Sequence, residues 1–240
     1  MPTIDPPPNW EKDALSQFLQ LAYNNQLVTA GRKPAPFYRL TAIDGLFLRI
    51  AQHIINPRNP TATNLFYRAH SAFRAACATA MAGQVTETFV LTRSCLEYAA
   101  YALHIQENPG YDLVWWARNQ SAKHKKAAIT SFALGRLRET IEKHDKRLAA
   151  VFDELYERTI DFGAHPNQSG VASSLSIDEG PERVAIVQAY LHADGLQMDH
   201  ALKTTAQVGI CALRITQFMM PDKFMLLGVQ DGIRHAENGL

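Results

Sequence analysis

The stretch TNLFYRAHSAFRAACATAMAGQVTETFVLTRSCLEYAAYALHIQ, from Thr63 to Gln106, decides the fold class. Its apolar residues recur at steps of three and four, which is the period of an α-helix and not of a strand. Thr63 is a candidate N-cap, and Gly83 separates an alanine-rich first helix from a second helix that begins at Thr86. The pattern predicts an antiparallel pair of helices.

The second helix of this pair is apolar on most sides and keeps only a narrow polar strip. That strip contains Thr86, Arg93, Glu97 and His104. Arg93 and Glu97 stand four residues apart and are able to pair. Two interpretations remain open: a partly desolvated pair with a structural or binding role, or a surface ion pair that contributes a few tenths of a kcal/mol.

The rest of the chain is also mainly helical in pattern, with helices expected over residues 13–25, 40–55, 111–118, 123–132, 134–160 and about 195–219. The long 134–160 segment has a possible break near His144. Residues 171–177 and 183–191 are rich in β-branched side chains around a Gly-Pro turn, which indicates a β-hairpin.

The expected fold class is therefore mainly α, a helical bundle with a small β-hairpin insertion. We divide the chain into two parts, of which residues 1–36 are an N-terminal leader with a short helix. Residues 37–240 form a single helical domain, with the hairpin at about 171–191.

The composition excludes several classes of protein. With 47% hydrophobic and 20% charged residues among 240, the chain is not disordered on a large scale. Its longest apolar stretches are interrupted by charged residues, so no membrane span is expected. The N-terminus lacks the features of a secretion signal, which predicts a cytoplasmic location. Cys77, Cys95 and Cys211 have no metal-ligand spacing and are expected to be reduced core thiols.

The net charge of +1 hides an uneven distribution. Residues 111–150 carry nine Lys or Arg against four Asp or Glu, whereas residues 151–240 carry six against twelve. The basic segment contains Trp115 and Trp116, followed by Lys123, Lys125 and Lys126. Aromatic rings beside basic side chains suit single-stranded RNA. The alternative is a solvated basic helix face with tryptophans that fill a core.

Arg158 and His165 form the candidate catalytic pair. They stand seven residues apart at the end of the 134–160 helix, so a continuous helix would place them on one face, about 10 Å apart along the axis. A guanidinium can hold a phosphodiester while an imidazole moves a proton.

A family resemblance rests on the residues around Arg93 and Glu97, followed by Tyr156-Glu-Arg158 and His165-Pro166. Residues 60–170 resemble uncharacterised prokaryotic helical families related to the HEPN superfamily. The resemblance implies a helical bundle that is commonly dimeric. It also implies that Arg158 and His165, with six residues between them, match the arginine–histidine motif of metal-independent HEPN ribonucleases. The residue after the arginine is Thr159, where active members usually have a polar residue such as Asn, Asp or His.

Other chemistries lack their sequence signatures. The chain has no P-loop, no dinucleotide-binding glycine motif, no hydrolase nucleophile elbow and no zincin motif. His192, Asp194, Asp199 and His200 could contribute nitrogen and oxygen ligands, but their spacing matches no standard metal site. No metal and no cofactor are predicted.

Two function hypotheses follow. In the favoured one, the bundle is a dimerisation or partner- or ligand-binding module, and Arg93, Glu97, Arg158 and His165 make structural polar contacts. In the alternative, it is a metal-independent endoribonuclease that uses Arg158 and His165. A homodimer is expected in either case. The reasons are the narrow alanine-rich helix at 63–83, the slim seam at Gly209, Ala212 and Thr216, and a 86–106 helix that needs neighbours on several sides.

Overall fold

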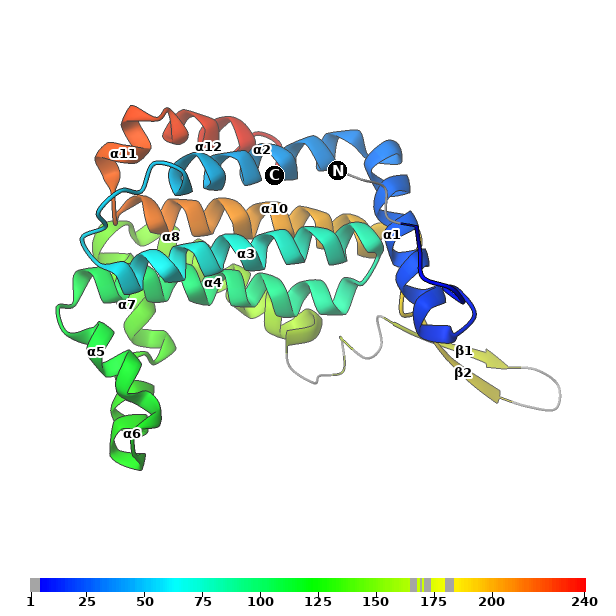
Figure 1. The fold of residues 1–240 in the computed structure, drawn as a ribbon, viewed down its shortest axis with the longest axis horizontal. Coiled ribbons are helices and arrows are strands. Elements are labelled where there is room, and N and C mark those ends of the chain that lie inside the picture. The colour runs from blue at the N-terminus through cyan, green and yellow to red at the C-terminus, as the bar shows by residue number, and fades with distance from the viewer. Residues whose placement is uncertain (1–4, 165–167, 169, 171–173, 180–183) are drawn as a thin grey trace.

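The computed structural model describes residues 5–164, 168, 170, 174–179 and 184–240. The protein is mainly α, as expected. Its long helices run roughly side by side along one axis, with α2 (Pro34–Ala51), α3 (Pro60–Ala82), α4 (Val85–Glu107) and α10 (Leu196–Gln217) at the centre (Figure 1).

The α3–α4 pair confirms the antiparallel hairpin predicted from the sequence. α3 begins earlier than expected, because Asn59 rather than Thr63 caps it by accepting a hydrogen bond from the Ala62 amide. Gly83 ends α3 with a φ of 85°. A Cβ at Gly83 would lie 2.3 Å from the carbonyl oxygen of His192, so both the turn and this close approach require glycine.

The small-residue surfaces of α3 and α10 are packed inside one chain. Along α3, Ala69, Ala76 and Ala80 are fully buried. On α10, Gly209 lies so close to Phe73 and Ile43 that an added Cβ would approach both side chains within 3 Å. The expectation that these seams form a dimer interface is therefore wrong, because neighbouring helices of the same chain already fill them.

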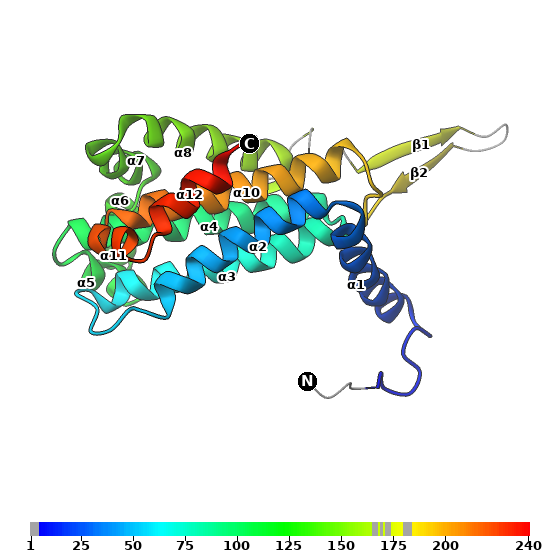
Figure 2. The same cartoon turned by 90° about the horizontal axis from the view of Figure 1, so that it is seen from above.

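The second layer consists of α7 (Leu134–His144) and α8 (Lys146–Thr159), with α12 (Val229–Glu237) beside α2 (Figure 2). The break expected near His144 is confirmed. Asp145 interrupts the helix and caps α8, accepting hydrogen bonds from the amides of Arg147 and Leu148 at 2.8 and 3.0 Å. A short helix, α11 (Pro221–Leu226), links α10 to α12.

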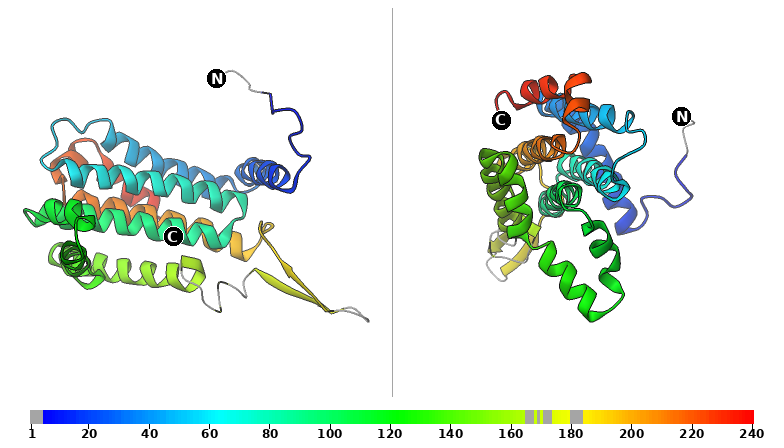
Figure 3. Two further views of the ribbon diagram at one scale, coloured as in Figure 1. Left: turned by 60° about the horizontal axis from the view of Figure 1, so that its bottom comes forward. Right: turned by 90° about the vertical axis from the view of Figure 1, so that its left-hand side faces the viewer.

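Two parts of the molecule project from the bundle. At one end, α5 (Tyr111–Trp116), a 3-10 turn (Ala117–Asn119) and α6 (Ala122–Ser131) form an arm (Figure 3). At the other end, α1 (Ala14–Arg32) runs away from the bundle axis (Figure 2). The helix predicted over 13–25 is thus longer and ends at Arg32.

The β-hairpin insertion requires a correction. Within its described residues the helical bundle contains no strand or sheet. β1 (Leu175–Glu179) and β2 (Val184–Gln188) pair only with each other, antiparallel, as a narrow ribbon outside the bundle (Figure 1). The expected strands over 171–177 and 183–191 are also wrong in their bounds, and residues 171–173 and 180–183 lie outside the described part. A β-branched pattern favours extended backbone, but it does not reveal whether that backbone packs on a core.

The three cysteines are free thiols of the core, as predicted. Burial raises the pKa of Cys77 and of Cys211 to about 12 and also raises the pKa of Cys95. These thiols are therefore uncharged near neutral pH. No helix in the described ranges is both long and apolar enough to span a membrane. The cytoplasmic location stays a prediction.

Candidate functional site

Arg158 is held between two helices. Its Nη1 donates a hydrogen bond to Gln207 Oε1 of α10 at 2.6 Å and lies 3.5 Å from Thr204 Oγ1. Its Nη2 donates to Glu154 Oε1, one turn earlier on α8, at 2.5 Å. The side chain is 20% exposed. These contacts hold α8 against α10. The hydrogen-bond donors of the guanidinium are directed at side chains of the protein itself.

His165 lies outside the described residues, so the structure does not place the second member of the candidate pair. The helix expected to connect the two is not continuous. α8 ends at Thr159, and Ile160–Ala164 form a π-helical turn in which Gly163 has a φ of 150°. A Cβ at Gly163 would lie 2.7 Å from Thr86, so α4 packs directly against this glycine. The α-helical spacing that put both side chains on one face therefore does not apply.

A different histidine, His200 of α10, lies near Arg158. Its ring packs against Phe162 at a centroid distance of 4.6 Å and against Phe89 at 5.5 Å. Burial lowers the pKa of His200, and the positive charges of Arg158 and Lys203 lower it further. In the sequence alone, His200 was a candidate only for metal binding. His200, Thr204 and Gln207 share one face of α10 by their spacing of four and three, which is the signal that was missed.

Arg93 and Glu97 form the predicted ion pair, and Tyr156 of α8 completes it. Arg93 Nε donates to Glu97 Oε1 at 2.9 Å, and Arg93 Nη2 donates to the Tyr156 hydroxyl at 2.7 Å. That hydroxyl in turn donates to Glu97 Oε1 at 2.9 Å. The pair is partly desolvated, and burial together with Glu97 raises the pKa of Tyr156 to about 12. This closed network joins α4 to α8 and favours the structural interpretation.

His104, predicted as a binding residue, is buried and links three helices. Nε2 donates to the carbonyl oxygen of Ser131 at 3.0 Å, and Nδ1 lies 2.6 Å from the Thr140 hydroxyl. Burial lowers the pKa of His104. In the neutral ring, which the lowered pKa favours, Nδ1 accepts the Thr140 hydroxyl proton that the Arg136 carbonyl oxygen, 3.0 Å away, would otherwise accept. His104 therefore stabilises the packing of α4 against α6 and α7.

The buried neutral state of His104 predicts a pH-dependent stability. Its folded pKa is lowered, so the unfolded chain takes up the proton first as the pH falls. The contribution is complete above the unfolded pKa of about 6.5 and is lost as the pH falls through the folded pKa. In urea unfolding between about pH 7 and pH 5, the wild type should lose stability more steeply than His104→Gln. His70 and His200 are present in both proteins, so parallel curves would contradict this role of His104.

The arm carries the tryptophans and lysines of the basic segment. The Trp115 ring packs against the core, whereas Trp116 is 63% exposed. The Trp116 indole N–H donates to Thr61 Oγ1 at 3.0 Å, which orients the exposed ring. The exposed lysines of α6 are Lys123, Lys125 and Lys126. The structure thus groups five predicted binding residues on the arm and separates them from Arg93, Glu97 and His104.

The acidic residues considered as metal ligands have another partner. Lys33, at the junction of α1 and α2, lies 2.5 Å from Asp194 and 2.7 Å from Asp199. His192 Nδ1 lies 2.9 Å from Gln197 Oε1. The described part of the chain contains no group of three or more His, Cys, Asp or Glu side chains that could hold a metal ion.

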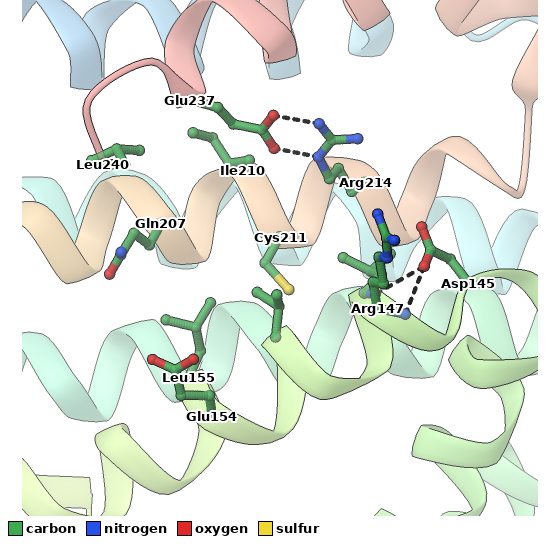
Figure 4. A pocket seen from close by; sticks show the side chains of 12 residues that line it. Asp145, Arg147, Glu154, Leu155, Gln207, Ile210, Cys211, Arg214, Glu237 and Leu240 are labelled. Atoms are coloured by element: carbon green, nitrogen blue, oxygen red, sulfur yellow. Dashed lines mark hydrogen bonds and ion pairs between the residues drawn. The ribbon is translucent and has the colours of Figure 1, made fainter.

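A pocket of about 320 Å³ lies between α8, α10 and the end of the chain that follows α12 (Figure 4). One end is apolar, with Leu155 and Ile210 in its walls and Cys211 also lining it. The other end is polar and contains Arg147 and Arg214 among charged side chains.

The surface of α1 is unusually apolar for a projecting helix. The 18 residues from Ala14 to Gly31 include no Asp, Glu, Lys or Arg. Six large side chains are each between 45% and 66% exposed: Leu15, Leu19, Leu21, Tyr23, Leu27 and Val28. Four of them, Leu15, Leu19, Tyr23 and Leu27, recur every four residues along one side of the helix, and we call these four the α1 patch. Contiguous exposed apolar surface on a protein commonly marks an interaction site.

Comparison of the chain with protein-family models, curated proteins and solved structures finds no match. The relationship to the HEPN superfamily therefore stays a hypothesis that rests on the residues quoted above.

Proposed function

We propose that this protein is a dimerising binding module and that the α1 patch is its self-association surface. The observation that carries the proposal is a run of 18 uncharged residues on a helix that projects into solvent with its apolar side chains exposed. Burying apolar side chains away from water is favourable by about 25 cal/mol for each Å² of surface buried.

The attachment of α1 to the bundle leaves the patch free. Three side chains in the last two turns of α1 donate to carbonyl oxygens at the end of α3: Asn25 to Ala82, Gln26 to Ala78 and Thr29 to Met81. These bonds orient α1 from its C-terminal half. The N-terminal half then extends beyond the bundle (Figure 2).

A second copy of the chain fits the patch better than a charged partner does. Leu15, Leu19, Tyr23 and Leu27 recur every four residues and form a stripe along a helix of 19 residues, about 28 Å long. Because the helix has no charges between its ends, two copies can lie antiparallel across a two-fold axis without like-charge repulsion. The ends also complement each other, since Asp13 precedes the helix and Arg32 ends it.

The test is the mass in solution. At about 10 µM the wild type should scatter light as a particle of about twice the 26.8 kDa chain mass. Leu19→Glu combined with Tyr23→Glu should raise the dissociation constant by roughly 100-fold or more, because each dimer would bury four unpaired carboxylates. The matched control is Met225→Glu with Leu226→Glu, which alters two exposed apolar residues of α11. A wild type of single-chain mass, or a control that dissociates equally, would contradict the proposal.

RNA binding by the arm is a second candidate, favoured by the exposed and oriented ring of Trp116 on the same arm as the α6 lysines. Single-stranded RNA affinity should then fall steeply with salt, by a log–log slope of about 0.7 for each phosphate neutralised. Replacing Lys123, Lys125 and Lys126 with Gln should reduce that slope by about 2. A control triple at Lys12, Lys143 and Lys203 should leave it unchanged. Absence of binding at low salt would exclude this candidate.

A further inference from the structure

We propose that the pocket between α8 and α10 binds a small amphipathic carboxylate, with Arg147 as the residue that meets its anionic group. This site is separate from the α1 patch and does not depend on dimerisation.

The apolar end of the pocket fits a hydrocarbon chain. Leu148, Leu155 and Ile210 are each 5% exposed or less, yet all three border the empty volume. Cys211 also borders it and is uncharged, because burial raises the pKa of its thiol to about 12. Side chains that border an empty space lack van der Waals partners on that side, and an apolar ligand supplies them.

The polar end of the pocket has one cation without a partner. Arg214 Nε and Nη2 donate to both carboxylate oxygens of Glu237, and Glu154 is paired with Arg158. The Asp145 carboxylate accepts two backbone hydrogen bonds. Among the described residues, the guanidinium of Arg147 makes no hydrogen bond and no ion pair. Each carboxylate in the wall therefore has a hydrogen-bond partner in the protein, whereas the guanidinium of Arg147 is exposed and has none among the described residues.

The position of Arg147 favours an anion over a neutral ligand. Its side chain extends from α8 toward Arg214 on α10, so two guanidinium groups lie at the same end of the pocket (Figure 4). Glu237 pairs with Arg214, and the Asp145 carboxylate in the same wall also acts on Arg214, but within the described residues neither carboxylate pairs with the Arg147 guanidinium. A carboxylate ligand placed beside Arg147 can accept two parallel hydrogen bonds from it.

The size of the pocket limits the ligand. A volume of about 320 Å³ is at the lower end of the usual range for small-molecule sites, which suits a chain of roughly ten carbons. Decanoate is therefore the probe, and decanol is its neutral counterpart of the same length.

The experiment measures binding of both probes by isothermal titration calorimetry below their aggregation concentrations. The wild type should bind decanoate at least tenfold more tightly than decanol. Arg147→Gln should remove that preference by weakening decanoate about tenfold or more, which is the usual effect of losing a charged hydrogen bond. Lys146→Gln makes the same change of charge one residue away, outside the pocket lining, and should bind as the wild type does.

A steric variant tests the location independently. Val151 is 44% exposed at the pocket wall, so Val151→Trp should fold and obstruct the cavity, abolishing binding of both probes. Circular dichroism should show that both variants remain folded. No binding to the wild type at millimolar concentration, equal affinity for the two probes, or unchanged binding by Val151→Trp would overturn the proposal.

Discussion

Gly209→Ala is expected to destabilise the protein by about 1–3 kcal/mol, and Gly209→Val by about 3 kcal/mol or more. The cause is the contact between α10 and two fully buried side chains. A Cβ at position 209 would lie 2.5 Å from the Phe73 ring and 2.8 Å from Ile43. Neither side chain has free space to move into, so the strain exceeds the gain in helix propensity of about 1 kcal/mol.

The same substitution at Gly45 should have the opposite sign. Gly45 lies on the exposed side of α2, and an added Cβ would meet no atom within 4 Å. Gly45→Ala should therefore stabilise the protein by roughly 0.5–1 kcal/mol. Urea titration of both variants checks the pair of signs. A stabilised Gly209→Ala would mean that α10 does not pack against α3 and α2 as closely as described.

RNA incubated with the purified protein in EDTA is expected to remain intact, because Arg158 is engaged by Glu154, Thr204 and Gln207. Arg158→Ala should instead lower the free energy of unfolding by about 1–3 kcal/mol, since it leaves partly buried polar partners of α10 unpaired. Arg136→Ala is the control: its ion pair with Glu139 is exposed on both sides and should contribute little.

The ribonuclease alternative predicts a different outcome. RNA would be cleaved in EDTA, and His165→Ala would reduce the rate by roughly 100-fold or more, as expected for loss of a general acid or base. Such a result would exclude the purely structural role of Arg158. His200→Ala is an informative companion variant, because His200 is the described histidine whose pKa Arg158 lowers.

Much of the helical architecture was predictable because it depends on neighbours in the chain. The apolar period of α3 and α4, the glycine between them and the pairing of Arg93 with Glu97 are all local features. Asp145 was harder to assign. Its capping geometry ends one helix and starts the next, although the sequence around it reads as nearly continuous.

The sequence-based predictions that the structure corrects concern contacts between segments that are far apart in the chain. Small residues on α3 and α10 indicate close helix packing, but the pattern does not specify whether the neighbour belongs to the same chain. Tyr156 as a third partner of the Arg93 pair follows from the contact of α8 with α4, and no spacing encodes it. The seven-residue spacing of Arg158 and His165 was interpreted as two turns of a regular α-helix. In the structure, residues Ile160–Ala164 form a π-helical turn, and Gly163 within it packs against Thr86 of α4.

The sequence by itself determined that this protein is helical, where its central hairpin turns, and that its middle segment is basic, because helix period, capping and charge are properties of adjacent residues. Only the tertiary structure decided which surfaces are filled and which remain open. Burial depends on what the rest of the chain brings to each face. Neighbouring helices of the chain cover Gly209 and contact Arg158. No neighbouring segment covers the apolar side chains of the α1 patch, and none supplies a partner for Arg147 at the pocket within the described residues.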